Sequence, residues 1–272
     1  MKYNNDILEK LIVEFIKNET KRIGIKKAVL GLSGGIDSAV SAYLTVKALG
    51  AENLLCVLMP YKTSSKESIE DANKVTKFLN VRSKIVEITG MVDAFLKNID
   101  EKSISNVRKG NIMARMRMIV LYDESANENA LVIGTGNKTE ILLGYTTIFG
   151  DSACGINPIG DLYKTQVFSL AEHLNVPAEI IKKKPSADLW IGQSDEEELG
   201  IKYEEVDKYL FHRVDERKSV EELIQSGFDK DYCERIEKMI SRNQFKRLPP
   251  IIAKVSNRTI NVDFRYNRDW NT

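Results

Sequence analysis

Apolar positions along the chain follow two spacings, and the two alternate through the first half of the sequence. From Ile7 to Ile16 they repeat at the helical interval, which predicts a helix over residues 4–22. Strand-like runs lie at 28–32, 54–59, 83–88 and 130–133, and of these 54–59 is nearly continuously apolar. Each is typical of a strand buried on both faces. Amphipathic stretches separate these runs, at 38–49, around 69–79, from Asn111 to about Tyr122, and at 138–143.

Strands that alternate with helices predict an α/β fold, a doubly wound, Rossmann-like parallel sheet covered on both faces. Ligands of such sheets bind beyond the carboxyl ends of the strands, so the loops at 33–38 and 135–140 should face one crevice. Residues 145–163 are Gly-rich without periodicity, as in a lid or binding loop. Short helices follow from Lys164, and an irregular arm from Leu248. We expect one domain over 1–272, with the core at about 1–190 and a helical, irregular extension at about 191–272.

The composition and net charge limit the kinds of molecule that we expect the protein to bind. Hydrophobic residues make up 43% of the chain, charged residues 29%, and the net charge is +1. The global charge therefore gives no indication of a nucleic-acid or membrane partner. The first residues lead into an amphipathic helix, not an apolar signal core. Three cysteines without paired spacing favour a reducing, cytoplasmic setting and disfavour a structural zinc site.

The clearest candidate chemistry is the loop Leu30-Gly-Leu-Ser-Gly-Gly-Ile-Asp-Ser38, between the first predicted strand and its helix. Gly34 and Gly35 permit a sharp turn that exposes backbone N–H groups. The following helix adds its own free N–H groups and the positive end of its dipole. Hydroxyls at 33 and 38 can donate to phosphate, and Asp37 can hold Mg²⁺. The loop lacks the Gly-Lys-Ser/Thr ending of a P-loop, yet it suits a pyrophosphate.

Other polar residues are ambiguous by themselves. Glu140 lies one turn into the helix after the fourth strand, where it could join Asp37 at a metal or simply favour the helix N-terminus. Thr135 lies in a Gly-Thr-Gly turn, and its hydroxyl could meet a nucleotide or serve only the turn. Lys164 is one of 40 basic residues and could be solvated. Ser186 could be a helix N-cap.

Several motifs carry a more specific resemblance. Residues 30–38 resemble the loop of the N-type ATP pyrophosphatases. Four further stretches, at 111–118, 134–140, 158–165 and 184–189, are similar in order and spacing to the NAD synthetases. The resemblance covers nearly the whole chain.

The resemblance implies a carbon–nitrogen ligase that amidates deamido-NAD to NAD with ammonia and ATP. The reaction passes through an acyl-adenylate, releases AMP and pyrophosphate, and needs Mg²⁺. By resemblance, Asp37 and Glu140 hold the metal, Arg115 and Lys246 contact deamido-NAD, and Asp151 is a catalytic candidate. The residues implied in ATP binding are Gly31, Leu32, Ser33, Gly34, Gly35, Ile36, Asp37, Ser38, Thr135, Lys164 and Ser186.

The resemblance also implies a homodimer, for which the region from Leu121 to Asn129 and the amphipathic helices are candidate contacts. Because the chain leaves no room for an added amidase module, we expect free ammonia, or ammonia from a separate partner, as the nitrogen donor. The sequence departs from many family members at three positions. Ile148 replaces a lysine, Gly155 an aspartate and Phe245 a histidine. The ATP contacts are therefore intact, whereas the dinucleotide contacts are only partly so.

Cys154 supports an alternative function. It lies in the Gly-rich loop, so another pyrophosphatase-loop enzyme, such as a sulfur transferase that delivers sulfur from this thiol, is a competing interpretation. The residue could equally be a small packing side chain.

Overall fold

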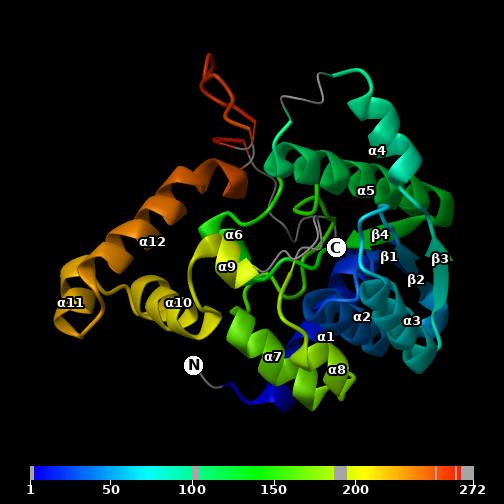
Figure 1. The fold of residues 1–272 in the computed structure, drawn as a ribbon, viewed down its shortest axis with the longest axis horizontal. Helices are drawn as coiled ribbons and strands as arrows, with labels where there is room; N and C mark the ends of the chain where they lie inside the picture. Colours follow the sequence, from blue (N-terminus) through cyan, green and yellow to red (C-terminus); the bar gives the residue numbers. More distant parts are fainter. Residues whose placement is uncertain (1–2, 100–103, 187–194, 249, 261, 265–272) are drawn as a thin grey trace.

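The computed structural model describes residues 3–99, 104–186, 195–248, 250–260 and 262–264. Its centre is a sheet of four parallel strands in the order β3-β2-β1-β4 (Figure 1). The parallel sheet that the sequence predicts is therefore confirmed. The strands are β1 (Lys27–Gly31), β2 (Leu54–Leu58), β3 (Arg82–Ile85) and β4 (Ala130–Ile133).

Helices cover both faces of the sheet, as a doubly wound fold requires. Side chains alternate along β1, so that Leu30 packs into one apolar cluster and Val29 into the other. The first cluster includes α1 (Asn5–Arg22), α2 (Ile36–Leu49), α3 (Lys66–Leu79), α7 (Lys164–His173) and α8 (Ala178–Lys182). The second includes α4 (Thr89–Leu96) and α5 (Asn106–Glu128). A 3-10 turn, η1 (Ala51–Asn53), precedes β2.

Strand β3 differs from the sequence prediction. Its four residues are all exposed, whereas β2 is buried throughout. The reason is its position at the sheet edge, with β2 on one side. Arg82 and Lys84 form ion pairs with Glu128 and Glu124 of α5, which keeps polar side chains on this edge.

Several helices also begin or end at residues other than those predicted from the sequence. The second helix begins at Ile36, two residues before the predicted start, because Gly35 is still extended. The helix α5 runs to Glu128, beyond the predicted end near Tyr122, and Asn129 ends it with a φ of 49°. The short helix α4 was not predicted.

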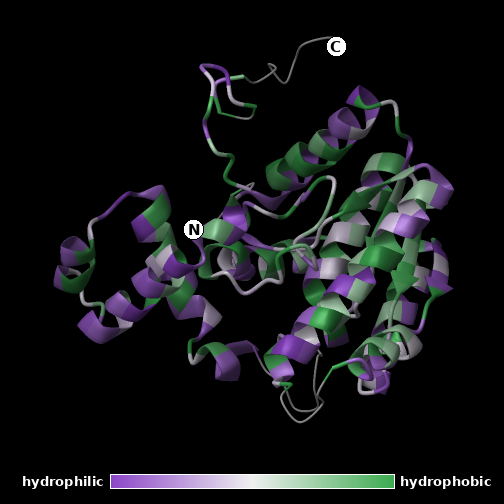
Figure 2. Cartoon of the chain, turned by 90° about the horizontal axis from the view of Figure 1, so that it is seen from above, coloured by the Kyte–Doolittle hydropathy of each residue, from purple (hydrophilic) through white to green (hydrophobic). Residues whose placement is uncertain are grey.

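A third apolar cluster, rich in tyrosine, lies beside the sheet and is formed by helices in the second half of the chain. Many residues of these helices are hydrophilic (Figure 2). Within the described residues, no helix has the length and apolar character needed to cross a membrane. The elements are α6 (Lys138–Leu143), α9 (Asp195–Leu199), α10 (Tyr203–Leu210), the π-helical η3 (Phe211–Asp215), α11 (Val220–Gln225), α12 (Lys230–Arg242) and η4 (Gln244–Arg247).

The segment 145–163 contains no helix, as expected, but it is tied to the sheet. The backbone N–H of Gly155 donates to the carbonyl of Val132 at 2.8 Å, and Ile156 bridges to Ile133. The loop thus continues the edge beside β4 and covers one side of the cleft.

Candidate active site

A cleft of about 750 Å³ opens at the carboxyl ends of β1, β2 and β4. Residues 31–33, 35–38, 58–60 and 132–135 line it, together with parts of the 145–163 loop and residues 183–186. The loops after the first and fourth strands do meet here, because Asn137 Nδ2 donates to Asp37 Oδ1 at 2.9 Å. The crevice predicted from the strand pattern is therefore confirmed.

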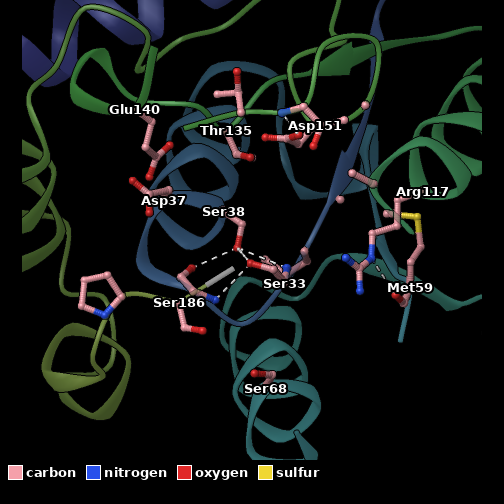
Figure 3. A pocket seen from close by; sticks show the side chains of 18 of the residues that line it. Ser33, Asp37, Ser38, Met59, Ser68, Arg117, Thr135, Glu140, Asp151 and Ser186 are labelled. Atoms are coloured by element: carbon pink, nitrogen blue, oxygen red, sulfur yellow. Dashed lines mark hydrogen bonds between the residues drawn. The ribbon is translucent and has the colours of Figure 1, made fainter. Parts of the chain in front are cut away.

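The loop 33–38 is fixed by its own hydroxyl groups (Figure 3). The Ser38 hydroxyl donates to the carbonyl of Gly35 at 2.9 Å, and the N–H of Ser33 donates to Ser38 Oγ at 3.2 Å. Gly34 has a φ of +82°, and a Cβ there would lie 2.1 Å from the carbonyl oxygen of Ser68. Only glycine allows this close approach to α3. The sequence thus folds into a rigid turn beneath the start of α2.

Three charged groups converge beside this turn. Lys164 Nζ lies 2.5 Å from Asp37 Oδ2 and 3.3 Å from Glu140 Oε1. The side chains of Asp37 and Glu140 face each other in Figure 3. Asn137 links them, because it bonds to Asp37 and also caps α6, where its Oδ1 accepts the N–H of Glu140 at 3.0 Å. The Asn-x-x-Glu spacing of a capping box was visible in the sequence, but the contact of Asn137 with Asp37 was not.

Burial sets the electrostatics of this group. Lys164 is only 2% exposed. Burial alone would lower the pKa of Lys164, but the two carboxylates outweigh it and raise that pKa above its ordinary value. Burial raises the pKa of Glu140, and the Lys164 ammonium opposes that rise. The three groups therefore depend on one another for their charges, and the carboxylates need a cation between them. A polyphosphate with its cations fits this charge pattern.

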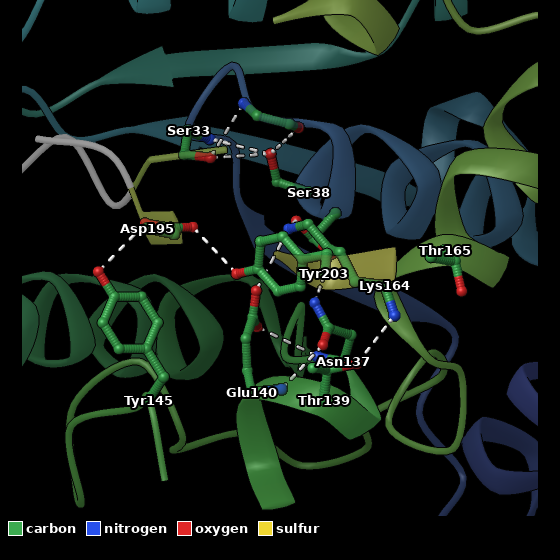
Figure 4. Close-up of polar contacts among 12 residues, drawn as sticks. Ser33, Ser38, Asn137, Thr139, Glu140, Tyr145, Lys164, Thr165, Asp195 and Tyr203 are labelled. Carbon is green, nitrogen blue, oxygen red and sulfur yellow. Dashed lines mark hydrogen bonds and ion pairs between the residues drawn. The ribbon is translucent and has the colours of Figure 1, made fainter. Parts of the chain in front are cut away.

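The cleft also contains a buried carboxylate that the sequence did not predict, Asp195. Asp195 is 4% exposed and accepts from the hydroxyls of Tyr145 at 3.1 Å and Tyr203 at 3.3 Å (Figure 4). Burial raises the pKa of Asp195, which the nearby Lys164 counteracts. The three residues come from separate segments, and no local pattern connects them. The Lys164 ammonium also lies 5.3 Å from the ring centre of Tyr203.

Asp151 and Lys246 both line the cleft, at the side of the Gly-rich loop. Asp151 accepts the N–H of Thr147 at 2.7 Å, and burial raises its pKa. Lys246 Nζ donates to the carbonyls of Gly144 at 2.6 Å and Thr146 at 2.8 Å, and burial lowers its pKa. Lys246 thus holds the loop from the C-terminal side. Its contact with substrate stays a prediction, as does the catalytic role of Asp151.

The remaining predicted residues divide between the cleft wall and its support. Thr135 and Ser186 line the cleft. Residues 187–189 of the last motif lie outside the described part of the chain. Arg115 is not among the described residues that line the cleft, and its guanidinium donates to the carbonyl of Ile148 at 3.3 Å. Arg117 is the arginine on the wall, and it donates to the carbonyl of Met59 at 3.1 Å.

Among the three positions that depart from the family pattern, packing explains the glycine at 155. A Cβ there would lie 2.3 Å from Leu131 Cδ1, so an acidic side chain would require Leu131 to move. Phe245 is 58% exposed. Cys154 packs against Gly134, and burial raises its thiol pKa. A raised pKa disfavours the thiolate that sulfur transfer needs.

The comparisons with known proteins agree with this geometry. The family model of NAD synthase matches residues 8–250. The chain is 53% identical to an NH3-dependent NAD(+) synthetase of Chlorobium phaeobacteroides (strain BS1), over 98% of this chain and 96% of the relative. Among solved structures it is similar to an NMN synthetase from Francisella tularensis, with 34% identity, a TM-score of 0.83, and coverage of 93% of this chain and 99% of that chain. An NH3-dependent NAD synthetase from Campylobacter jejuni gives 38% identity, a TM-score of 0.80, and coverage of 93% and 100%.

Proposed function

The chain belongs to the NAD synthase family, and from this premise we propose how its cleft works. The enzyme is a carbon–nitrogen ligase that amidates deamido-NAD to NAD with ammonia, at the expense of ATP. The observation that carries the assignment of the site is the meeting of Asp37, Glu140 and Lys164 at the pyrophosphate-type loop. The alternative of sulfur transfer through Cys154 is not favoured.

In the proposed mechanism the chain chiefly positions and neutralises groups. The nicotinate carboxylate attacks the α-phosphorus of ATP, the bond to pyrophosphate breaks, and ammonia then displaces AMP from the acyl-adenylate. The turn at 33–38 and the start of α2 hold the phosphates through backbone N–H groups. Lys164 places a positive charge where the leaving pyrophosphate gathers negative charge. Thr135 and Ser186 contact the nucleotide from the opposite walls.

Magnesium fits the residues present. Asp37 and Glu140 already share one cation, the Lys164 ammonium, so their oxygens are arranged around a positive charge. Mg²⁺ is commonly bound by one or two carboxylates together with substrate phosphates. We propose that these two residues hold it, and that bound Mg²⁺ supplies charge neutralisation at the phosphates.

The acceptor needs a direct test, because one similar structure is that of an NMN synthetase. Many family members carry a lysine and an aspartate where this chain has Ile148 and Gly155, so two polar groups are missing from the dinucleotide side. A mononucleotide acid is therefore the second candidate acceptor. Purified enzyme given ATP, Mg²⁺ and ammonium should convert deamido-NAD with a higher kcat/KM than nicotinic acid mononucleotide. The reverse order would assign the enzyme to the mononucleotide.

Three broader features complete the proposal. We propose that residues 1–272 work as one synthetase domain, because α10 of the extension packs on α6 and α7, and α12 packs on α6, beside the cleft. We propose a homodimer, for which α5 offers exposed apolar residues, and a cytoplasmic location. Within the dimer, Arg115 and Lys246 would contact deamido-NAD, and Asp151 would lie beside the reacting carboxylate.

A further inference from the structure

The helical extension reaches the back of the cleft through one fully buried carboxylate, Asp207 of α10. Its side chain is 0% exposed. One oxygen accepts the hydroxyl of Thr139 in α6 at 2.5 Å, and the other accepts the backbone N–H of Thr165 in α7 at 2.7 Å. The hydroxyl oxygen of Thr139 in turn accepts the backbone N–H of Lys164 at 3.0 Å. Asp207 thus joins three helices at one point.

These bonds perform a capping function for α7. The first N–H groups of a helix have no intrahelical acceptor, and the residue before the helix usually supplies one from its side chain. Tyr163, which precedes α7, makes no such bond from its side chain. The N–H groups of Lys164 and Thr165 are satisfied instead by Thr139 and Asp207. The cap therefore comes from two other helices, which fixes α7 relative to both.

The joint lies directly behind the charged groups of the cleft. Glu140 follows Thr139 in α6, and Lys164 precedes Thr165 in α7. The gap of 3.3 Å between Lys164 Nζ and Glu140 Oε1 therefore depends on how the two helix starts are held together. A second contact supports the same joint from outside, because Asp215 of η3 accepts from Lys138 at 2.8 Å and from the Tyr163 hydroxyl at 2.6 Å.

The charge of Asp207 is costly at this depth. Burial raises its pKa, and the bonds from Thr139 and Thr165 oppose that rise. Asp207 does not line the cleft in the described structure, so it has no direct path to substrate. An apolar side chain could fill a core position without this cost. What a carboxylate offers here is two acceptor oxygens that point at two different helix starts.

We propose that Asp207 is a positioning residue of the ATP site. It holds the start of α7 against the start of α6 and so sets the Lys164 ammonium between Asp37 and Glu140. The inference rests on the proposed function, because it gives Asp207 a part in binding ATP with Mg²⁺.

Calorimetric titration with ATP and Mg²⁺, without acceptor so that no turnover occurs, tests the proposal. Asp207→Asn replaces one acceptor oxygen by an NH2 group, which cannot accept from either donor. We expect the affinity for ATP to fall about tenfold to a hundredfold. In steady-state assays the KM for ammonia should change less than about twofold, because ammonia does not contact this joint. A general loss of structure would not divide the two substrates in this way.

A second pair of variants keeps the test decisive if Asp207→Asn does not fold. Thr139→Val removes the hydroxyl and should weaken ATP binding, whereas Thr139→Ser keeps it and should restore binding. Glu237→Gln is the matched control, because Glu237 accepts from Tyr209 and Arg213 within the same helical cluster. It should bind ATP as the unchanged protein does. Thermal unfolding by circular dichroism identifies the folded variants.

The possible results distinguish a failure of the role of Asp207 from a failure of the proposed function. Unchanged ATP affinity in folded Asp207→Asn, or equal affinity in Thr139→Val and Thr139→Ser, would overturn the role of Asp207. If the unchanged protein itself binds no ATP in the presence of Mg²⁺, the proposed function fails as well.

Discussion

Lys164 is the residue at which the electrostatics of the cleft meet. Its ammonium is 2% exposed and contacts carboxylates from α2 and α6. A buried group of this kind adds little to stability beyond what apolar packing would give, because the Lys164 ammonium is removed from water and the side chains of Asp37 and Glu140 are only 18% and 16% exposed. The three charged residues are better explained by function, because they hold one cation and two anions in place beside the proposed phosphate site.

At this scale the first prediction concerns the two carboxylates. Asp37→Asn or Glu140→Gln removes a charge that we assign to magnesium, so kcat/KM for ATP should fall about a hundredfold or more. Glu14→Gln is the control, because Glu14 lies on the surface of α1 with its side chain 60% exposed. Coupled detection of AMP release measures the effect. Normal turnover in either cleft variant would refute the metal assignment.

The second prediction concerns Cys154. Replacement by serine is close in volume, and the thiol plays no part in the proposed chemistry, so Cys154→Ser should keep amidation within about twofold. Measuring NAD formation with ammonium as donor checks this. Complete loss of NAD formation in a folded variant would contradict this and would give the thiol a part in the amidation.

At the scale of elements, the turn between β1 and α2 has the least freedom. Gly34 combines a left-handed φ of +82° with backbone contact to Ser68. The hydroxyls of Ser33 and Ser38 then lock the turn from within. The backbone that we propose to bind phosphate is thus formed before any ligand arrives, which would limit the ordering cost of binding.

Gly34→Ala should disrupt this turn. The added Cβ would lie 2.1 Å from the Ser68 carbonyl, so the loop must shift, and ATP binding should fall below detection in titration calorimetry. The φ alone costs about 1–3 kcal/mol in the free energy of unfolding.

Gly24→Ala separates the two effects, because Gly24 has a φ of +70° with nothing within 4 Å of the added Cβ. It should lose stability in urea unfolding but keep ATP binding. Equal ATP affinity in both variants would contradict the account of the turn.

The sequence predicts elements well where the pattern is local. The strand β4 and the helix α6 match their predicted bounds, and the loop 33–38 lies where its motif requires. The exposed edge of β3 was missed because its place in the sheet depends on strand order, not on its own residues. Tyr145, Asp195 and Asp207 were missed for a related reason. Their partners lie on other elements, up to 68 residues away in the bond between Thr139 and Asp207, and no spacing rule connects them.

At the scale of the whole molecule, the sheet and the helical extension form the cleft together. The sheet supplies the turn at 33–38 and the end of β4, while the extension contributes Asp195 to the lining and braces α6 and α7. The helix α5 also carries exposed apolar residues, with Ile119 at 52% and Tyr122 at 42% exposure, and on these we base the proposed contact between copies.

Sedimentation equilibrium tests the proposed homodimer. The protein should sediment at twice its mass of 30.8 kDa. Ile119→Glu places a charge in the apolar surface of α5 and should shift the equilibrium toward monomer. Ile7→Glu is the control, because Ile7 is 63% exposed on α1, which packs on the opposite face of the sheet from α5. A monomer at every concentration of the unchanged protein would refute the proposal.

The central claim is that the cleft joins the acceptor carboxylate to the α-phosphorus of ATP. The most direct measurement uses deamido-NAD labelled with oxygen-18 in its carboxylate, turned over with ATP, Mg²⁺ and ammonium, and mass spectrometry of the products. The account predicts that one labelled oxygen passes from the carboxylate to AMP, and that pyrophosphate carries none. Label in pyrophosphate, or NAD formed with unlabelled AMP, would contradict it.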